Sequence, residues 1–136
     1  MQFEDTAAFL LAKVATAQKN TLEKHVNSVG LHSGQVFVLM ELWKTDGQRQ
    51  IDLAARLNLS PPTVNKILGG LLENDFVTRA RYEDDARSTR IFLTQKGIDV
   101  RQDLEQAWEA LEDQTLLGLT DTEALMLKQL LQKLFG

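Results

Sequence analysis

The 136-residue sequence contains no cysteine and only two prolines, the adjacent Pro61 and Pro62. The lack of cysteine excludes a disulfide framework, a thiolate zinc site and a thiol-based redox switch. Apolar runs are short, as in VFVLM at residues 36–40, and the first residues do not have the pattern of a secretion signal. We therefore expect one ordered domain that is cytoplasmic and not associated with a membrane.

Positive charge is scarce overall but concentrated in the middle of the chain. Fifteen Lys and Arg residues face 19 Asp and Glu residues, which gives a net charge of −4. Residues 49–96 hold eight basic and six acidic side chains, whereas residues 97–136 hold three basic and eight acidic ones. Duplex binding depends largely on neutralising phosphates, so the net charge argues weakly against a nucleic-acid partner. The basic middle segment points the other way.

The spacing of apolar residues predicts a mainly α-helical chain. Spacings of three to five suit a long amphipathic helix over residues 5–29, and Ser33 can cap a central helix whose body, residues 35–44, is apolar nearly all round. Four more helices are expected, over residues 51–60, from Ser60 to about Asn74, from a Thr94 cap to about Leu117, and from a Thr120–Glu123 capping box onward. Between Phe76 and Leu93 the period falls towards two, which predicts a β-hairpin.

Residues 50–69, QIDLAARLNLSPPTVNKILG, have the spacing of a helix-turn-helix. Ala54 is small where the two helices would cross, and Asn58 can adopt the left-handed conformation at the turn. Ser60 followed by Pro61 suits the start of the second helix. An ordinary helical hairpin within a core would share this pattern, so the motif alone does not decide between them.

The outer face of the second helix points to DNA. Pro62, Thr63, Asn65 and Lys66 lie outward near the helix start if the apolar residues face the core. Asparagine can pair with adenine, the threonine methyl can contact thymine, and lysine can reach guanine or phosphate. The helix N-terminus, beginning at Ser60, also favours a phosphate. The alternative is a solvated polar face, which would more often carry Glu and Lys.

Arginines gather on the predicted hairpin. Arg79 lies on its first strand, and Arg87 and Arg90 lie at its tip and on its return strand. Arginines placed in this way can enter a narrow minor groove, and an acidic neighbour such as Asp85 can hold one of them in a fixed posture. A cluster of surface ion pairs, each worth about 0 to 1 kcal/mol, is the alternative.

The segment NDFVTRARYEDDARSTRIFLTQKG, residues 74–97, resembles the wing of the MarR family of winged helix-turn-helix transcription regulators. That family has Asp-x-Arg-x-x-Arg followed by Leu-Thr-x-x-Gly. The matching residues here are Asp85, Arg87, Arg90, Leu93, Thr94 and Gly97. One departure is Asp75, where the family usually has glycine, so Asn74 or Asp75 is expected to take a positive φ at some cost.

The resemblance implies a winged helix-turn-helix protomer over residues 1–136, mainly α with a β-hairpin wing and six helices. Residues 33–97 would form the DNA-binding lobe, and residues 1–30 and 98–136 would form the dimerisation region. It further implies a homodimeric repressor that binds double-stranded DNA, with the fourth helix in the major groove and Arg87 in the minor groove. The DNA-binding residues it favours are Ser60, Pro62, Thr63, Asn65, Lys66, Arg79, Asp85, Arg87 and Arg90.

Other chemistries receive little support from the sequence. The resemblance suggests a small aromatic or anionic inducer, to which His25, His32 and Trp43 are conceivable contributors, although packing or surface exposure is favoured for each. With no cysteine and no third ligand at a diagnostic spacing, no metal site is expected, and no cofactor is expected either. No motif for a nucleophile, phosphate loop or carboxylate pair is present, so an enzyme is not expected. The competing hypothesis is a winged-helix module that binds protein instead of duplex DNA.

Overall fold

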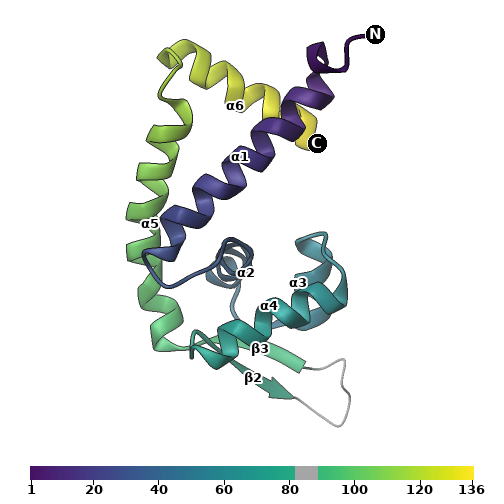
Figure 1. The fold of residues 1–136 in the computed structure, drawn as a ribbon. Coiled ribbons are helices and arrows are strands. Elements are labelled where there is room, and N and C mark those ends of the chain that lie inside the picture. Colours follow the sequence, from purple (N-terminus) through teal and green to yellow (C-terminus); the bar gives the residue numbers. More distant parts are fainter. Residues whose placement is uncertain (82–88) are drawn as a thin grey trace.

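The computed structural model describes residues 1–81 and 89–136. In this part of the chain the elements are a short 3₁₀ turn η1 (Phe3–Asp5), α1 (Ala7–Asn27), α2 (Ser33–Lys44), β1 (Gln48–Arg49), α3 (Gln50–Arg56), α4 (Pro61–Glu73), β2 (Val77–Arg81), β3 (Thr89–Leu93), α5 (Gln95–Leu116) and α6 (Asp121–Phe135). Helices α1, α5 and α6 lie together, and α2, α3, α4 and the sheet form the rest of the molecule (Figure 1). The predicted fold class, mainly α with six helices and a β-hairpin, is confirmed.

Helix α2 lies at the centre of the core, as its composition predicts. Val36, Val38, Leu39 and Leu42 have no exposed surface. They pack with buried residues from α1, α3, α4, β2, β3 and α5 in one apolar cluster, to which α6 contributes no buried residue. Burial of each such side chain stabilises the fold by roughly 1.5–3 kcal/mol.

Side-chain caps set most helix starts where the sequence predicts them. Ser60, Thr94 and Thr120 each accept a hydrogen bond from the backbone N–H three residues later. The prediction for Ser33 is wrong by one position, because Ser33 is the first residue of α2 and its N–H donates to the Glu23 carboxylate, 2.8 Å away. That carboxylate reaches across from α1, a partner that local sequence does not reveal.

The first and third helices are shorter than predicted. Helix α1 starts at Ala7, because Thr6 caps it and accepts the Phe9 N–H at 3.2 Å. Helix α3 ends at Arg56, since the chain enters the left-handed region at Asn58, with φ of 53°. The apolar residues that follow Arg56 belong to the turn, where Leu59 N–H donates to the Ala54 carbonyl at 3.0 Å.

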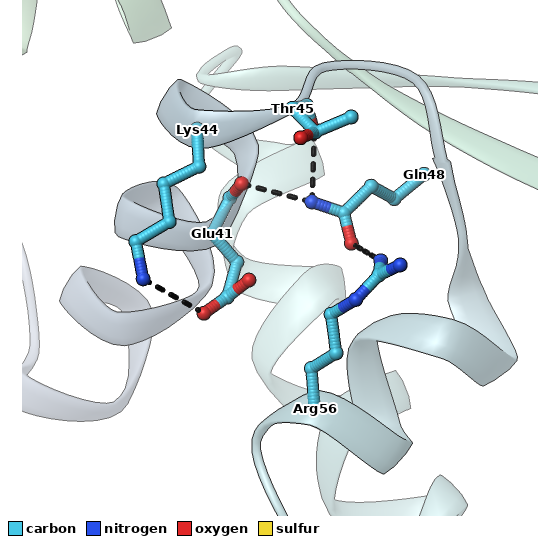
Figure 2. A network of polar contacts seen from close by, with 5 residues as sticks. All are labelled: Glu41, Lys44, Thr45, Gln48 and Arg56. Atoms are coloured by element: carbon cyan, nitrogen blue, oxygen red, sulfur yellow. Dashed lines mark hydrogen bonds and ion pairs between the residues drawn. The ribbon is translucent and has the colours of Figure 1, made fainter.

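The sheet has a third strand that the sequence analysis missed. Strand order is β1-β3-β2 with antiparallel neighbours, and Arg49 of β1 lies opposite Arg90 of β3. Two residues are too few to produce a period-2 signal. A buried side chain holds β1 in place: Gln48 Nε2 donates to the carbonyls of Glu41 and Thr45, at 2.8 Å each, and its Oε1 accepts from Arg56 (Figure 2). This network joins the end of α2 to α3 and to the root of the hairpin.

An unpartnered apolar surface extends over α1 and α6. Within the described residues, the side chains of this surface that are between 42% and 69% exposed are Leu10, Leu11, Val14, Leu125, Met126, Leu130, Leu131 and Leu134. In α1, by contrast, Leu22 and Val26 are buried against the core. The start of α1 and the end of α6 lie side by side (Figure 1), and Leu11, Leu131 and Phe135 line a common hollow. None of the described helices is both apolar and long enough to cross a membrane.

Candidate DNA-binding surface

Helices α3 and α4 form a compact helix-turn-helix. Ala54, 5% exposed, lies at the crossing, and Leu53 of α3 and Val64 of α4 are fully buried. Asn58 has the predicted positive φ, which lets the chain reverse before the Ser60 cap. The turn thereby fixes the direction in which α4 leaves the core.

The predicted reading residues share one exposed face. Pro62, Thr63, Asn65 and Lys66 are all exposed, whereas Val64 between them is buried. Ser60 is exposed as well, at the N-terminal end of the same helix. Free N–H groups and the helix dipole make this end favourable for a phosphate. The structure brings these five residues together at one end of α4.

Two contacts restrict how this face can present its polar groups. Asn65 Oδ1 accepts a hydrogen bond from Gln50 Nε2 at 3.2 Å, and the hydroxyls of Ser60 and Thr63 lie 2.8 Å apart. With its oxygen engaged by Gln50, Asn65 has its two amide N–H donors left for a further partner. A base acceptor, such as O6 or N7 of guanine, suits that arrangement better than the two-hydrogen-bond pairing with adenine. Gln50 is thus a residue of this surface that the sequence analysis did not single out.

The paired glycines of α4 have different surroundings. A Cβ at Gly70 would lie 2.7 Å from Gln35 Nε2, so close packing of α2 explains glycine there. At Gly69 no heavy atom of the described residues lies within 4 Å of such a Cβ, and the residue is exposed. Nothing in this described part of the chain explains the glycine at position 69.

The described part of the wing carries two of the predicted arginines. Arg79 on β2 and Arg90 on β3 are both exposed. Arg90 Nη1 donates to the Gly47 carbonyl at 2.9 Å, and Ala80 lies opposite Arg90 in the sheet. Arg90 is therefore tied to the loop before β1, whereas no such tie is found for Arg79 among the described residues. The other two predicted wing residues, Asp85 and Arg87, lie at residues 82–88, outside the described part of the chain.

An ion pair between Arg49 and Asp52 reduces the positive charge beside β1. Arg49 and Arg90 are neighbours across the sheet, and Arg49 contacts Asp52 through Nε at 2.9 Å and Nη2 at 3.2 Å. The hydrogen bonds from Arg49 lower the pKa of the Asp52 carboxyl below its ordinary value. Asp52 thus stays ionised and neutralises one of the two adjacent guanidinium groups.

The Leu-Thr-x-x-Gly motif joins the wing to α5. Thr94 Oγ1 accepts the Gly97 N–H at 3.1 Å and donates to the Asp75 carbonyl at 2.5 Å. Asp75 has a φ of 61°, so the expected positive φ occurs here without glycine. A Cβ at position 97 would lie 2.1 Å from the Phe76 carbonyl oxygen, which leaves room for glycine alone. The motif is therefore a latch that sets the angle between wing and helix.

His25, His32 and Trp43, the three residues considered for an inducer site, do not lie in one common pocket. His25 Nδ1 contacts the Thr21 carbonyl at 2.9 Å, and His32 Nδ1 lies 2.7 Å from the Glu23 carboxylate. The hydrogen bond with His32, followed by that from the Ser33 N–H, lowers the pKa of Glu23. Trp43 lines a hollow between α2 and α5, which neither histidine lines. Among the described residues no group of His, Asp and Glu could hold a metal ion.

These features define the chain as a winged helix-turn-helix protein of the kind that binds DNA. The MarR family model matches residues 31–89. The regulator BilQ from Clostridium symbiosum is 29% identical over 116 residues, 85% of this chain and 78% of BilQ. The repressor YetL from Bacillus subtilis is 29% identical over 89 residues, 64% of this chain and 53% of YetL.

A solved structure extends the similarity to the whole fold. A MarR-family regulator from Rhodococcus sp. RHA1 matches with a TM-score of 0.85 and 25% identity, covering 98% of this chain and 96% of that one. The chain is therefore similar to the MarR family of transcriptional regulators in sequence over residues 31–89 and in fold over nearly its whole length. The predicted resemblance to the MarR family is thereby confirmed, and members of that family are transcription regulators, not enzymes.

Proposed function

We propose that the protein is a homodimeric transcriptional repressor that binds an inverted-repeat operator. The observation that carries this proposal is the exposed polar face at the start of α4, where Pro62, Thr63, Asn65 and Lys66 lie together next to the cationic wing. Helix α4 would enter the major groove through these residues. Arg79 and Arg90 would follow the phosphates, and Arg87, with Asp85 beside it, would enter the minor groove.

The exposed apolar surface of α1 and α6 supports the homodimer. A soluble monomer rarely exposes a contiguous apolar patch of this kind, and a second copy of the chain would cover it. Two protomers related by a twofold axis would present their α4 helices about 34 Å apart, which suits successive major grooves. The operator would then be an imperfect inverted repeat.

The bound protein would occupy a promoter in the cytoplasm and thereby repress transcription. The relative YetL is named a repressor, which supports repression over activation. A small molecule that favours one spacing of the two reading helices would relieve repression in proportion to its differential affinity for the two states. The hollow between α2 and α5 supports the existence of a ligand, because it lies where these two helices meet.

Binding to duplex DNA at several salt concentrations tests the proposal. The logarithm of the affinity should fall steeply as the logarithm of the salt concentration rises, because bound phosphates release counterions. Arg87→Ala and Arg79→Ala should each weaken binding to every duplex and reduce the salt slope by about 1. Lys24→Ala, which removes an exposed cation from α1, is the matched control and should leave both quantities unchanged. Absence of duplex binding at low salt would refute the proposal.

A further inference from the structure

Gly69 lowers the stability of α4 without a reason inside the described part of the protein. It lies within the helix, four residues before the last helical residue, Glu73. Glycine in a helix interior is less favourable than alanine, because glycine loses more backbone freedom when the chain folds. Gly69 is not among the glycines with a positive φ, so other residues can adopt its backbone conformation. Its neighbour Gly70, by contrast, is explained by the close packing of Gln35.

Gly69 faces in the same direction as two of the reading residues. Residues three and four positions apart lie on one face of a helix. Lys66 and Asn65 stand three and four positions before Gly69, and all three residues are exposed. Leu68 and Leu71, on the other face, have no exposed surface. Gly69 therefore extends the exposed face of α4 by one turn and adds no side chain to it.

The missing side chain lets another molecule come closer to the backbone of α4. No heavy atom of the described residues lies within 4 Å of a Cβ placed at position 69. Without this atom the helix surface is lower by about 1.5 Å, the length of a carbon–carbon bond. A helix with its side chains is about 10–12 Å wide and the major groove is about 12 Å wide, so the fit between them is tight. One methyl group can therefore decide how deeply the helix enters.

The charges on either side of Gly69 indicate where a duplex would contact α4. Lys66, one turn earlier, is exposed and forms no ion pair with any of the described residues, so it can bind a phosphate. Glu73, four positions after Gly69, is exposed and would repel phosphates. A duplex held by Lys66 can thus lie against Gly69 and has to leave the helix before Glu73.

We propose that Gly69 is a point of close approach between α4 and the operator, where the helix backbone lies directly against the sugar–phosphate wall of the major groove. The residue acts by position, because it sets the depth at which Asn65 reaches the base edges. This inference rests on the proposed function. It adds to that function a residue with no polar group of its own side chain.

Gly69→Ala and Gly69→Leu test the inference in the full chain. The probe is a duplex of about 30 base pairs, three helical turns, that the wild type selects from a random pool. Gly69→Ala should bind this duplex about tenfold more weakly, as expected when one methyl overfills a fitted contact, and Gly69→Leu should lose more. The slope of log affinity against log salt should stay unchanged, because no cation is removed. Without DNA, Gly69→Ala should nevertheless melt at a higher temperature than the wild type.

Gly118→Ala is the matched control for the added methyl. Gly118 is exposed, and no heavy atom of the described residues lies within 4 Å of a Cβ placed there. It lies in the turn between α5 and α6, far from α4 (Figure 1). The substitution should change duplex affinity less than about twofold. Light scattering checks that all three variants keep the oligomeric state of the wild type.

Three outcomes would overturn the inference and leave the proposed function intact. They are undiminished duplex affinity in Gly69→Ala, a lower melting temperature of that variant, which would show that the fold itself requires glycine, and an equal loss of affinity in Gly118→Ala. Failure of the wild type to bind any duplex at low salt would instead refute the proposed function, and the inference with it.

Discussion

Replacement of Gly97 by alanine should weaken the latch between wing and α5. The added Cβ would lie 2.1 Å from the Phe76 carbonyl oxygen and 3.2 Å from Leu93 Cδ2. The Phe76 backbone cannot easily yield, because its carbonyl accepts the Thr94 N–H at 3.1 Å and its N–H donates to the Leu71 carbonyl at 2.9 Å. Relief of the clash requires a backbone shift of about an ångström and loss of at least one of these hydrogen bonds.

The expected loss follows from two opposing effects. Overpacking of this kind costs about 1–3 kcal/mol, and a weakened backbone hydrogen bond costs about 1 kcal/mol more. Alanine regains less than about 1 kcal/mol of helix propensity, since position 97 lies in the first turn of α5. The net effect is a loss of about 2–3 kcal/mol in the free energy of unfolding.

Gly69→Ala is the matched control, because the same chemical change is made in a helix where the Cβ has open space. It should stabilise the protein by about 0.5–1 kcal/mol. At equal protein concentration, thermal unfolding should shift downward by about 5–10 °C for Gly97→Ala and upward by about 2 °C for Gly69→Ala. A melting temperature of Gly97→Ala at or above that of the wild type would refute the latch.

Three further predictions concern the reading face, the dimer and the α1–α2 joint. Asn65→Ala should relax the base preference at one base pair of the bound duplex, and Gln50→Ala should shift that base preference towards adenine by freeing the Asn65 oxygen. Selection of preferred duplexes from a random pool would reveal both changes. An unchanged base preference in Gln50→Ala would contradict the orienting contact between Gln50 and Asn65. Leu130→Glu should yield a monomer by light scattering at micromolar concentration, while Ile98→Glu, a change at an equally exposed apolar residue outside the α1–α6 surface, should stay dimeric. The pKa of Glu23 is lowered from its ordinary value of 4.5, so its contribution to stability is present above that pH and is lost as the pH falls through the lowered value. Glu23→Gln should therefore lower the melting temperature at pH near 7, and this loss should shrink as the pH falls below 4.5. A loss of the same size at neutral and at acidic pH would show that the charge is not the cause.

The order of elements and the helix-turn-helix were predictable because they depend on local chemistry. Apolar periodicity places the buried faces, and short polar residues such as Ser60, Thr94 and Thr120 satisfy free N–H groups at helix starts wherever they occur. The exposed face of α4 also follows from periodicity, since Val64 and Leu68 must point inward. The family resemblance could also be recognised from the sequence, because the residues of its motif lie close together in the chain.

Contacts between residues distant in sequence could not be predicted. The partners of Arg90 and Trp43 are backbone carbonyls of Gly47 and Gly97, 43 and 54 residues away, and backbone carbonyls carry no sequence signature. The two-residue strand β1 forms only because β3 supplies its hydrogen bonds, and Gln48 then closes on the end of α2.

The sequence by itself determined the approximate positions of the helices, the caps at Ser60, Thr94 and Thr120, the turn at Asn58 and the polar face of α4, because each depends on interactions within about four residues along the chain. Only the tertiary structure decided why Gly97 leaves no room for a side chain, which amide orients Asn65, and that Trp43 and Trp108 line one hollow. These depend on how close separate elements approach one another. That distance is set by packing of the whole core and is encoded in no single segment.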